Sequence, residues 1–365
     1  MKNKPIMKFN KKARLFAISV CLITLFTVSS CMDKTVKIEL KPVPETAVLE
    51  ENGYFVWGAS AVKGDDGLFH LIYSRWRKEH SFNAWATHSE VAHAVSANLL
   101  GPYKFRNAAL PARDSSYCDG TTTHNPSIHK FGNKYYLYYT GNTGYRKCHK
   151  GALNMVHRNN QRIGVAVTDD LNGTWKRFDK PLIDISSDDN APDALCTNNP
   201  AITQMPNGKF LMIYKCVGKK RGLPFGGPVA HLAAFSDSPT GPFIKNLTPL
   251  FTSDKSDFPA EDPYIWTQGD KVYAIVKDIK GVFTGTGGYS LALFETTDGL
   301  NWKTAENSLV TERLIKWDDG ITQKVANLER PQLYQEDGEP KAIFFAVNPS
   351  DFSHTFNVHI PLKCK

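Results

Sequence analysis

The chain has 365 residues, of which 41% are hydrophobic and 22% charged, and it carries a formal net charge of +8 at pH 7. Six basic residues and no acidic residue fall within the first 30 positions, so this segment supplies six of the eight net positive charges. The remaining chain is close to neutral, which excludes a nucleic-acid-binding function inferred from the overall charge.

The N-terminal segment has the three parts of a bacterial secretion signal. Basic residues precede an apolar stretch at 15–28, which is followed by Ser29-Ser30-Cys31. The ending Val-Ser-Ser-Cys indicates a lipobox, whose cysteine becomes the lipidated first residue of the mature protein. A transmembrane anchor is the alternative, but the apolar run is shorter than the ~20 residues that a span needs. We therefore predict a signal peptide over 1–30, a linker over 31–49, and a lipid anchor at Cys31 that holds the protein on a membrane of the bacterial cell envelope, periplasmic or outer-membrane.

A short phrase recurs along the rest of the chain. A degenerate copy, GASAV, is found at 58–62, and clearer copies are HNPSI at 124–128, NNPAI at 198–202, EDPYI at 261–265 and ERPQL at 329–333. The clearer copies start 74, 63 and 68 residues apart. This spacing is too wide for a helical solenoid and suits a four-stranded propeller blade with its loops.

Each copy opens a β-hairpin. The chain crosses a turn that contains Gly or Asn and returns in an aromatic-rich strand, such as YYLYYT at 135–140 and FLMIYK at 210–215. A third strand follows in each unit, and helical periodicity is hard to find after residue 40. We predict an all-β fold, a five-bladed β-propeller over 50–365, with a β-sandwich as the alternative. In a propeller, the varied residues before each Pro converge on one pocket.

Five cysteines remain beyond the predicted signal and Cys31, in an oxidising compartment. Residues that face each other across a hairpin have a constant index sum, which is 265 for the turn near 132 and 413 for the turn near 206. Cys118 with Cys148 gives 266, and Cys196 with Cys216 gives 412. We therefore predict disulfides 118–148 and 196–216, with Cys364 free. Five buried or free thiols are the alternative.

The segment HNPSIHKFGNKYYLYYT, with the exit motifs LLGPYKF and PTGPFIK, resembles the second-blade phrase of family 43 glycoside hydrolases and their relatives. The resemblance covers roughly residues 50–350. It implies a five-bladed propeller that cleaves arabinosides, xylosides or related sugars. It also implies three carboxylates: an Asp base on blade one, an Asp on blade three that tunes the acid, and a Glu acid on blade four.

Only one of these carboxylates is present. The acid falls on Glu261 in EDPYIW, the tuning residue falls on Asn199, and the base falls near Ala59 or Ser60, where no carboxylate stands. Inverting hydrolysis needs a second carboxylate ~6.5–9.5 Å from the acid. Either another blade supplies the base, or the chemistry differs, or the propeller only binds sugar.

Glu329 is the first choice for the missing carboxylate, because blade five lies between blades four and one in a closed ring. Alternatively, it pairs with a neighbouring basic residue. Asp262 is expected to point away from Glu261, since neighbours on a strand face opposite sides. Asp119 and Asp193 precede blades two and three in loops, where each acts as the base or caps the loop.

His124 occupies the axial position of blade two. A neutral imidazole there acts as a general base, contacts a sugar hydroxyl, binds a central metal, or is structural. The group His80, His88 and His93 lacks a spacing that specifies zinc. We predict that no cofactor is required, and a structural central cation stays open.

Arg75, Lys215 and Lys277 end the second strands of their blades and are expected to face one rim. The planar fork of arginine suits carboxylate or sulfate, which favours an acidic glycan, and surface solubility is the alternative. Tryptophans at 57, 76, 85 and 266 supply sugar-stacking faces or inter-blade core. The predicted substrate contacts are Ser60, Arg75, Asn125, Asn199, Lys215, Lys277 and Arg330.

The sequence thus predicts an exo-acting glycoside hydrolase for an acidic plant or algal glycan, uronic or sulfated. Glu261 is its general acid, Glu329 and His124 complete the catalytic group, and an oligo- or polysaccharide is the partner. Two other functions stay open. One is a polysaccharide lyase on the same scaffold, in which His124 or a tyrosine abstracts the proton next to a uronate carboxyl and a basic residue neutralises the charge. The other is a glycan-binding lipoprotein without activity. The oligomeric state is left open.

Overall fold

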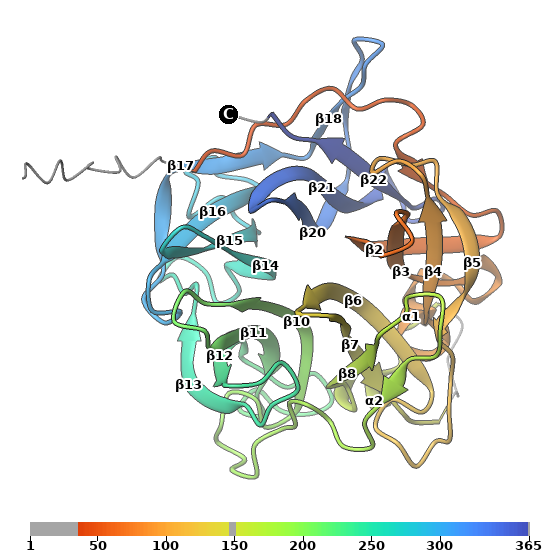
Figure 1. Ribbon diagram of the computed structural model, residues 1–365. Helices are drawn as coiled ribbons and strands as arrows, with labels where there is room; N and C mark the ends of the chain where they lie inside the picture. The colour runs from red at the N-terminus through yellow and green to blue at the C-terminus, as the bar shows by residue number, and fades with distance from the viewer. Residues whose placement is uncertain (1–35, 146–150, 364–365) are drawn as a thin grey trace, which may run out of the picture. The chain divides into compact units, whose positions relative to one another are not determined.

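The computed structural model describes residues 36–145 and 151–363. This part forms five four-stranded antiparallel sheets around an axis, and one two-stranded hairpin (Figure 1). The prediction of an all-β, five-bladed propeller is confirmed. The predicted signal peptide, Cys31, Cys148 and Cys364 lie outside the described residues, so the predicted lipid anchor stays a prediction. Within the described ranges, no helix has the length and apolar character needed to cross a membrane.

The blades follow one another along the chain, each beginning at the axis. Blade one contains β2 (Tyr54–Lys63), β3 (Phe69–Arg77), β4 (Glu90–Ser96) and β5 (Lys104–Leu110). Blade two contains β6 (Thr122–Phe131), β7 (Lys134–Asn142), β8 (Arg162–Thr168) and β9 (Lys176–Arg177). Blade three contains β10 (Cys196–Gln204), β11 (Phe210–Val217), β12 (Val229–Ser236) and β13 (Ile244–Leu250).

Blade four contains β14 (Ala260–Gln268), β15 (Lys271–Asp278), β16 (Ser290–Thr296) and β17 (Lys303–Glu312). Blade five contains β20 (Asn327–Glu336), β21 (Glu339–Asn348), β22 (Phe356–Pro361) and β1 (Val48–Leu49). The separate hairpin pairs β18 (Leu314–Lys316) with β19 (Thr322–Lys324). The short helices are η1 (Lys78–His80), η2 (Phe82–Ala84) and α1 (Trp85–His88) between β3 and β4, and α2 (Met155–Asn159) between β7 and β8.

The ring is closed by a strand from the other end of the chain. β1 pairs with β22, so the outermost strand of blade five precedes blade one in sequence. The first and last parts of the propeller are thereby joined through backbone hydrogen bonds. The residues at opposite ends of the sequence can then contribute to one axial site.

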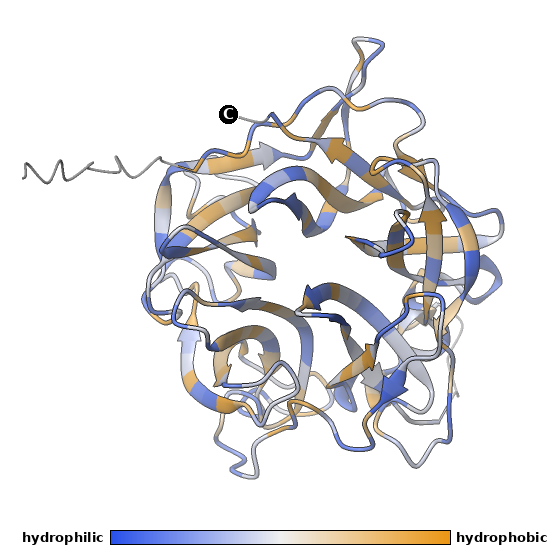
Figure 2. Ribbon diagram, viewed as in Figure 1, coloured by the Kyte–Doolittle hydropathy of each residue, from blue (hydrophilic) through white to orange (hydrophobic). Residues whose placement is uncertain are grey.

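Apolar side chains fill each of the five boundaries between neighbouring blades. Ile213 of blade three shares a cluster with Ile265 of blade four, and Leu71 of blade one shares one with Phe344 of blade five. Figure 2 shows hydrophobic segments in the strands of every blade. Burial of apolar surface on both faces of every sheet holds the blades together.

The predicted 196–216 disulfide is wrong. Cys196 and Cys216 are both free, and the β10–β11 register pairs Cys196 with Val217 and Thr197 with Cys216. An offset of one residue places the two thiols on opposite faces of the sheet. Cys118 is also free, and its expected partner Cys148 lies outside the described residues.

Differential alkylation without reductant is expected to find Cys196 and Cys216 unmodified in the native protein and fully modified after unfolding. Both thiols are buried, and burial raises their pKa, so the reactive thiolate is scarce in the folded state. Peptide mass spectrometry after trypsin digestion checks this. A crosslinked 196–216 peptide would contradict the register, and labelling of either residue in the native protein would contradict its burial.

Candidate active site

The repeated phrase builds the same backbone irregularity on all five inner strands. The pairing register shifts at each phrase. The second residue of each phrase has a positive φ: 50° at Gly58, 52° at Asn125, 52° at Asn199, 51° at Asp262 and 55° at Arg330. The copy on blade one therefore starts at Trp57, one residue before the predicted start. A bulge with one left-handed residue bends the strand and redirects its side chains.

Asp262 was expected to point away from Glu261, and the structure shows otherwise. Both residues line the same axial cavity, because the register shift in β14 and the φ of Asp262 break the alternation of faces. The same holds in blades two, three and five, where the first two residues of each phrase line the cavity. In blade one the second position is Gly58, which brings no side chain to the site.

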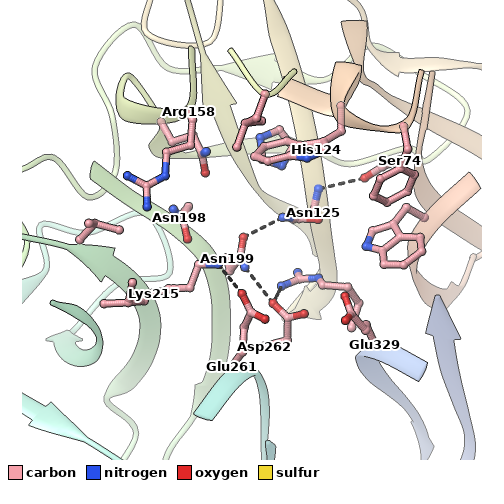
Figure 3. Close-up of a pocket in the computed structure, with 18 of the residues that line it drawn as sticks. Ser74, His124, Asn125, Arg158, Asn198, Asn199, Lys215, Glu261, Asp262 and Glu329 are labelled. Atoms are coloured by element: carbon pink, nitrogen blue, oxygen red, sulfur yellow. Dashed lines mark hydrogen bonds and ion pairs between the residues drawn. The ribbon is translucent and has the colours of Figure 1, made fainter. Parts of the chain in front are cut away.

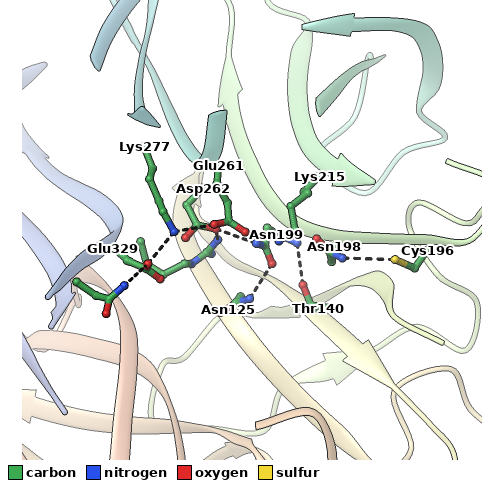
Figure 4. Close-up of polar contacts among 12 residues, drawn as sticks. Asn125, Thr140, Cys196, Asn198, Asn199, Lys215, Glu261, Asp262, Lys277 and Glu329 are labelled. Carbon is green, nitrogen blue, oxygen red and sulfur yellow. Dashed lines mark hydrogen bonds and ion pairs between the residues drawn. The ribbon is translucent and has the colours of Figure 1, made fainter. Parts of the chain in front are cut away.

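Four of the positive-φ residues form a hydrogen-bonded network around the axis, which we call the central network (Figure 4). Asn125 Nδ2 donates to Asn199 Oδ1 (2.7 Å), and Asn199 Nδ2 donates to Asp262 Oδ1 (2.8 Å). Arg330 Nη1 donates to the same Asp262 oxygen (3.1 Å). Arg330 also packs over Gly58, where a Cβ would lie 3.5 Å from its side chain. Asn199, Asp262 and Arg330 are buried, Asn125 is half-buried, and all four side chains line the cavity.

The axial cavity has a volume of about 370 Å³. Aromatic rings form much of its wall, while polar and charged side chains lie at its base (Figure 3). The aromatic residues are Trp57, Trp76, Phe82, Trp85, Phe258 and Phe352. Trp266, the fourth tryptophan considered from the sequence, lies instead in the core between blades four and five.

Two glutamates of the cavity share one lysine. Lys277 Nζ lies 2.7 Å from Glu261 Oε2 and 2.7 Å from Glu329 Oε1, and Lys215 Nζ lies 2.7 Å from Glu261 Oε1. Asn327 Nδ2 donates to Glu329 Oε1 at 2.9 Å. We call Glu261, Glu329, Lys215 and Lys277 the glutamate–lysine cluster. It joins blades three, four and five at the cavity.

The pKa values of the two carboxyl groups in this cluster are shifted in opposite directions. Burial alone would raise the pKa of Glu261, but the positive charges of Lys215 and Lys277 outweigh it and lower that pKa far below its usual range. Burial raises the pKa of Glu329 in spite of Lys277, and the negative charge of Glu261 adds to the rise. Glu261 is therefore held as a carboxylate, whereas Glu329 is the carboxyl that more readily carries a proton.

His124 lies in the wall of the cavity beside Trp85, with ring centroids 5.0 Å apart. Neither ring nitrogen has a hydrogen-bond partner within the described residues. Burial, with the positive charges of Arg330 and Lys215, lowers the pKa of His124 to about 3, so the imidazole is neutral. It offers one donor and one acceptor to a ligand, and its catalytic role stays a prediction.

Three of the predicted substrate contacts, Ser60, Arg75 and Lys277, do not line the cavity themselves. Ser60 Oγ instead accepts a hydrogen bond from Ile128 N (3.1 Å) and ties blade one to blade two. Arg75 pairs with Glu51 (2.6 Å) and Glu90 (2.9 Å), away from the axis. Its neighbours Ser74 and Trp76 line the cavity, because the strand turns alternate side chains to opposite faces. Asn125, Asn199, Lys215 and Arg330 do line the cavity, and Lys277 reaches it through both glutamates.

The loop carboxylates Asp119 and Asp193 are structural. Asp119 is buried against Arg113 (2.6 Å) and Arg177 (3.4 Å), and Asp193 pairs with Lys245 (2.7 Å). Neither lines the cavity. No base is therefore supplied from these loops.

In the described ranges, no group of three or more His, Cys, Asp or Glu side chains is placed to hold a metal ion. His93 stacks on His70, and His80 stacks on His88. Arg330 supplies a positive charge near the axis. A central cation stays a prediction.

Sequence reasoning missed several residues of the cavity. Asn198 is the first residue of the blade-three phrase and occupies the position of His124, Glu261 and Glu329, so the repeat itself identifies it. Arg158 and Gln161 come from α2 and the segment after it. Their position depends on how one inter-strand connection folds over the cavity, and no repeated pattern marks them.

Solved glycoside hydrolases share this fold. A family 117 glycoside hydrolase from the marine bacterium Zobellia galactanivorans has a TM-score of 0.59 and 16% identity, over 88% of this chain and 90% of that chain. A structure described as a glycoside hydrolase has a TM-score of 0.63 and 14% identity, over 90% and 93%. The native arabinanase Arb43A of Bacillus subtilis has a TM-score of 0.57 and 12% identity, over 86% and 95%. No protein-family model and no curated protein sequence matches the chain. The comparisons establish that this chain shares its five-bladed propeller fold with these glycoside hydrolases.

Proposed function

We propose that this protein is a glycoside hydrolase whose active site is the axial cavity. The observation that carries the proposal is the Glu261–Lys277–Glu329 bridge at the base of an aromatic-walled cavity. Its two carboxyl groups have pKa values displaced in opposite directions, as required of a proton donor and a carboxylate that act together. The aromatic wall offers faces on which sugar rings stack.

Glu329 is the proton donor in this proposal, and Glu261 is the carboxylate. The sequence predicted Glu261 as the general acid, but two lysine ammonium groups stabilise its ionised form. A general acid must be protonated before it can assist departure of the leaving oxygen. The raised pKa of Glu329 favours this state, so the two roles are exchanged relative to the sequence prediction.

The lysine bridge also limits the separation of the two carboxyl groups. The nearest oxygens each lie 2.7 Å from Lys277 Nζ, so they are no more than twice that distance apart. Inverting hydrolases keep their carboxyl groups ~6.5–9.5 Å apart, whereas retaining enzymes keep them ~5–5.5 Å apart. The pair therefore fits the retaining reaction, in which Glu261 attacks the anomeric carbon and Glu329 protonates the leaving oxygen.

In this proposal the enzyme is exo-acting. Asn199, Asp262 and Arg330, which are at most 5% exposed, bound the axial side of a cavity of about 370 Å³. A cavity of this size, bounded in this way, favours the end of a glycan chain.

A panel of plant and algal oligosaccharides, separated by chromatography after incubation, tests this function. We expect release of single sugars from the non-reducing end, and proton NMR of the first product should show retained anomeric configuration. Initial inversion would overturn the role of Glu261 as nucleophile. Unsaturated products that absorb as conjugated uronates would indicate the lyase reaction instead, with His124 as the candidate base.

Glycan binding without turnover is the second candidate function. The observation in its favour is that the blade-one position equivalent to Asp262 is Gly58, so blade one brings no carboxylate to the axis. Calorimetric binding of an oligosaccharide that no enzyme preparation cleaves would support this candidate and contradict the hydrolase.

A further inference from the structure

Four cationic side chains line the axial cavity or contact its glutamates: Arg158, Lys215, Lys277 and Arg330. Lys215 and Lys277 pair with the glutamates, and Arg330 pairs with Asp262. Arg158 is the one of these four that has no carboxyl partner within the described residues.

Within the described residues, the hydrogen-bond partners of Arg158 are all uncharged. Its Nη1 donates to Asn159 Oδ1 (2.9 Å) and to Phe225 O (2.8 Å). No carboxylate of the described chain lies within ion-pair distance of it, and its Nε and Nη2 make no hydrogen bond there. A guanidinium has five donors in a fixed fork. Most of this fork is therefore available at the wall of the cavity.

The helix that carries Arg158 is firmly held. The Asn154 side chain caps α2 by accepting from Val156 N and His157 N, and His157 Nδ1 bonds Asn142 Oδ1 (2.7 Å) in the interior. Asn159 Nδ2 donates to Pro224 O (2.8 Å) of the next blade. Because both flanks of Arg158 are anchored, its guanidinium is positioned before a ligand binds.

A polar group without a partner lines the same cavity. Asn198 is 3% exposed, lines the cavity, and its Oδ1 has no partner within the described residues. Figure 3 shows the Arg158 guanidinium directed toward Asn198, on the side of the cavity away from Glu329. An amide oxygen and a guanidinium together suit a sugar that carries a hydroxyl donor next to an anionic group.

We propose that Arg158 recognises an anionic substituent, a carboxylate or a sulfate, on the sugar bound in the cavity. The inference rests on the proposed hydrolase function and names its substrate class. Arg75, Lys215 and Lys277, which suggested an acidic glycan in the sequence, are already paired with carboxylates. Arg158 takes this role instead, through a bidentate pair with the anionic group.

Matched substrates test the inference directly. Uronate oligosaccharides from pectin and glucuronoxylan are compared with their carboxyl-reduced forms, and sulfated algal oligosaccharides with their desulfated forms. For the pair that the wild type cleaves, Arg158→Gln should raise KM for the anionic member roughly 10- to 100-fold. KM for the neutral member should be unchanged. Arg158→Lys, which keeps the charge but loses the fork, should give an intermediate rise. The substrate pair whose KM depends on Arg158 identifies the recognised group as a carboxylate or a sulfate.

Arg221→Gln is the matched control, since Arg221 lies on the nearby loop, does not line the cavity and pairs with Asp257 at the surface. Unchanged cleavage of the neutral member shows that Arg158→Gln is folded. Equal losses on anionic and neutral members would overturn the inference while leaving the hydrolase intact. Arg158-dependent binding of the anionic member by calorimetry, without cleavage, would instead support recognition and contradict the hydrolase.

Discussion

Glu329→Gln is expected to lower kcat on the natural glycan by about 10²- to 10⁴-fold, with KM nearly unchanged. The amide has the shape of the carboxyl and can still accept hydrogen bonds from Lys277 and Asn327, but it cannot give a proton to the leaving oxygen. An aryl glycoside with an acidic phenol as leaving group needs little protonation. Its cleavage should therefore fall far less in the variant, and this contrast is specific to a proton donor.

Glu336→Gln is the control for this prediction. Glu336 ends the same strand β20 at the surface, where it pairs with Lys63. We expect wild-type kinetics on both substrates. An equal loss on the glycan and on the aryl glycoside in Glu329→Gln would mean that Glu329 positions other groups and does not donate the proton.

The pH profile of the wild type follows from the same assignment. A proton donor works only while protonated, and the raised pKa of Glu329 extends this state to higher pH than an ordinary glutamate allows. We expect kcat/KM to fall as the pH rises through the pKa of Glu329. Glu261, whose pKa is lowered by Lys215 and Lys277 against the effect of burial, stays ionised over the whole of that range. The alkaline limb should be absent in Glu329→Gln.

The blades were predictable because each phrase repeats the same scaffold. A Pro follows the positive-φ residue in four copies, and the turn after the strand carries Gly or Asn, so the start of each inner strand was marked in the sequence. The axial residues Glu261, Glu329 and His124 were found for the same reason. Closure through β1 was not foreseen, because a strand of two residues has no pattern of its own.

The details of the site depended on geometry that the pattern leaves open. Strand alternation predicted that Asp262 turns away from Glu261, and one left-handed residue reverses that result. A one-residue error in hairpin register was enough to predict a bond between Cys196 and Cys216, which lie on opposite faces. The proposed exchange of roles between the glutamates depends on which lysines reach Glu261, and only the assembled ring determines that.

Asp262→Asn is expected to destabilise the protein by about 3–5 kcal/mol. Asp262 and Arg330 are 4% exposed each, and they form the ion pair of the central network. Asparagine tolerates the φ of 51° at this position, so the backbone is preserved and the main change is loss of the negative charge. Arg330 would then be left as a buried cation without its partner. Urea unfolding followed by tryptophan fluorescence measures the change in the free energy of unfolding.

Removing both partners tests whether the loss of stability comes from the ion pair or from a general effect on core packing. Because much of the loss in Asp262→Asn is the penalty of an uncompensated buried charge, the double variant Asp262→Asn with Arg330→Met should be less destabilised than the sum of the two single variants. Asp257→Asn, which breaks the exposed pair with Arg221, should change the free energy of unfolding by less than about 0.5 kcal/mol. Additive losses in the double variant would show that the network stabilises the ring through packing alone. The charge pair would then have no part in joining blade four to blade five.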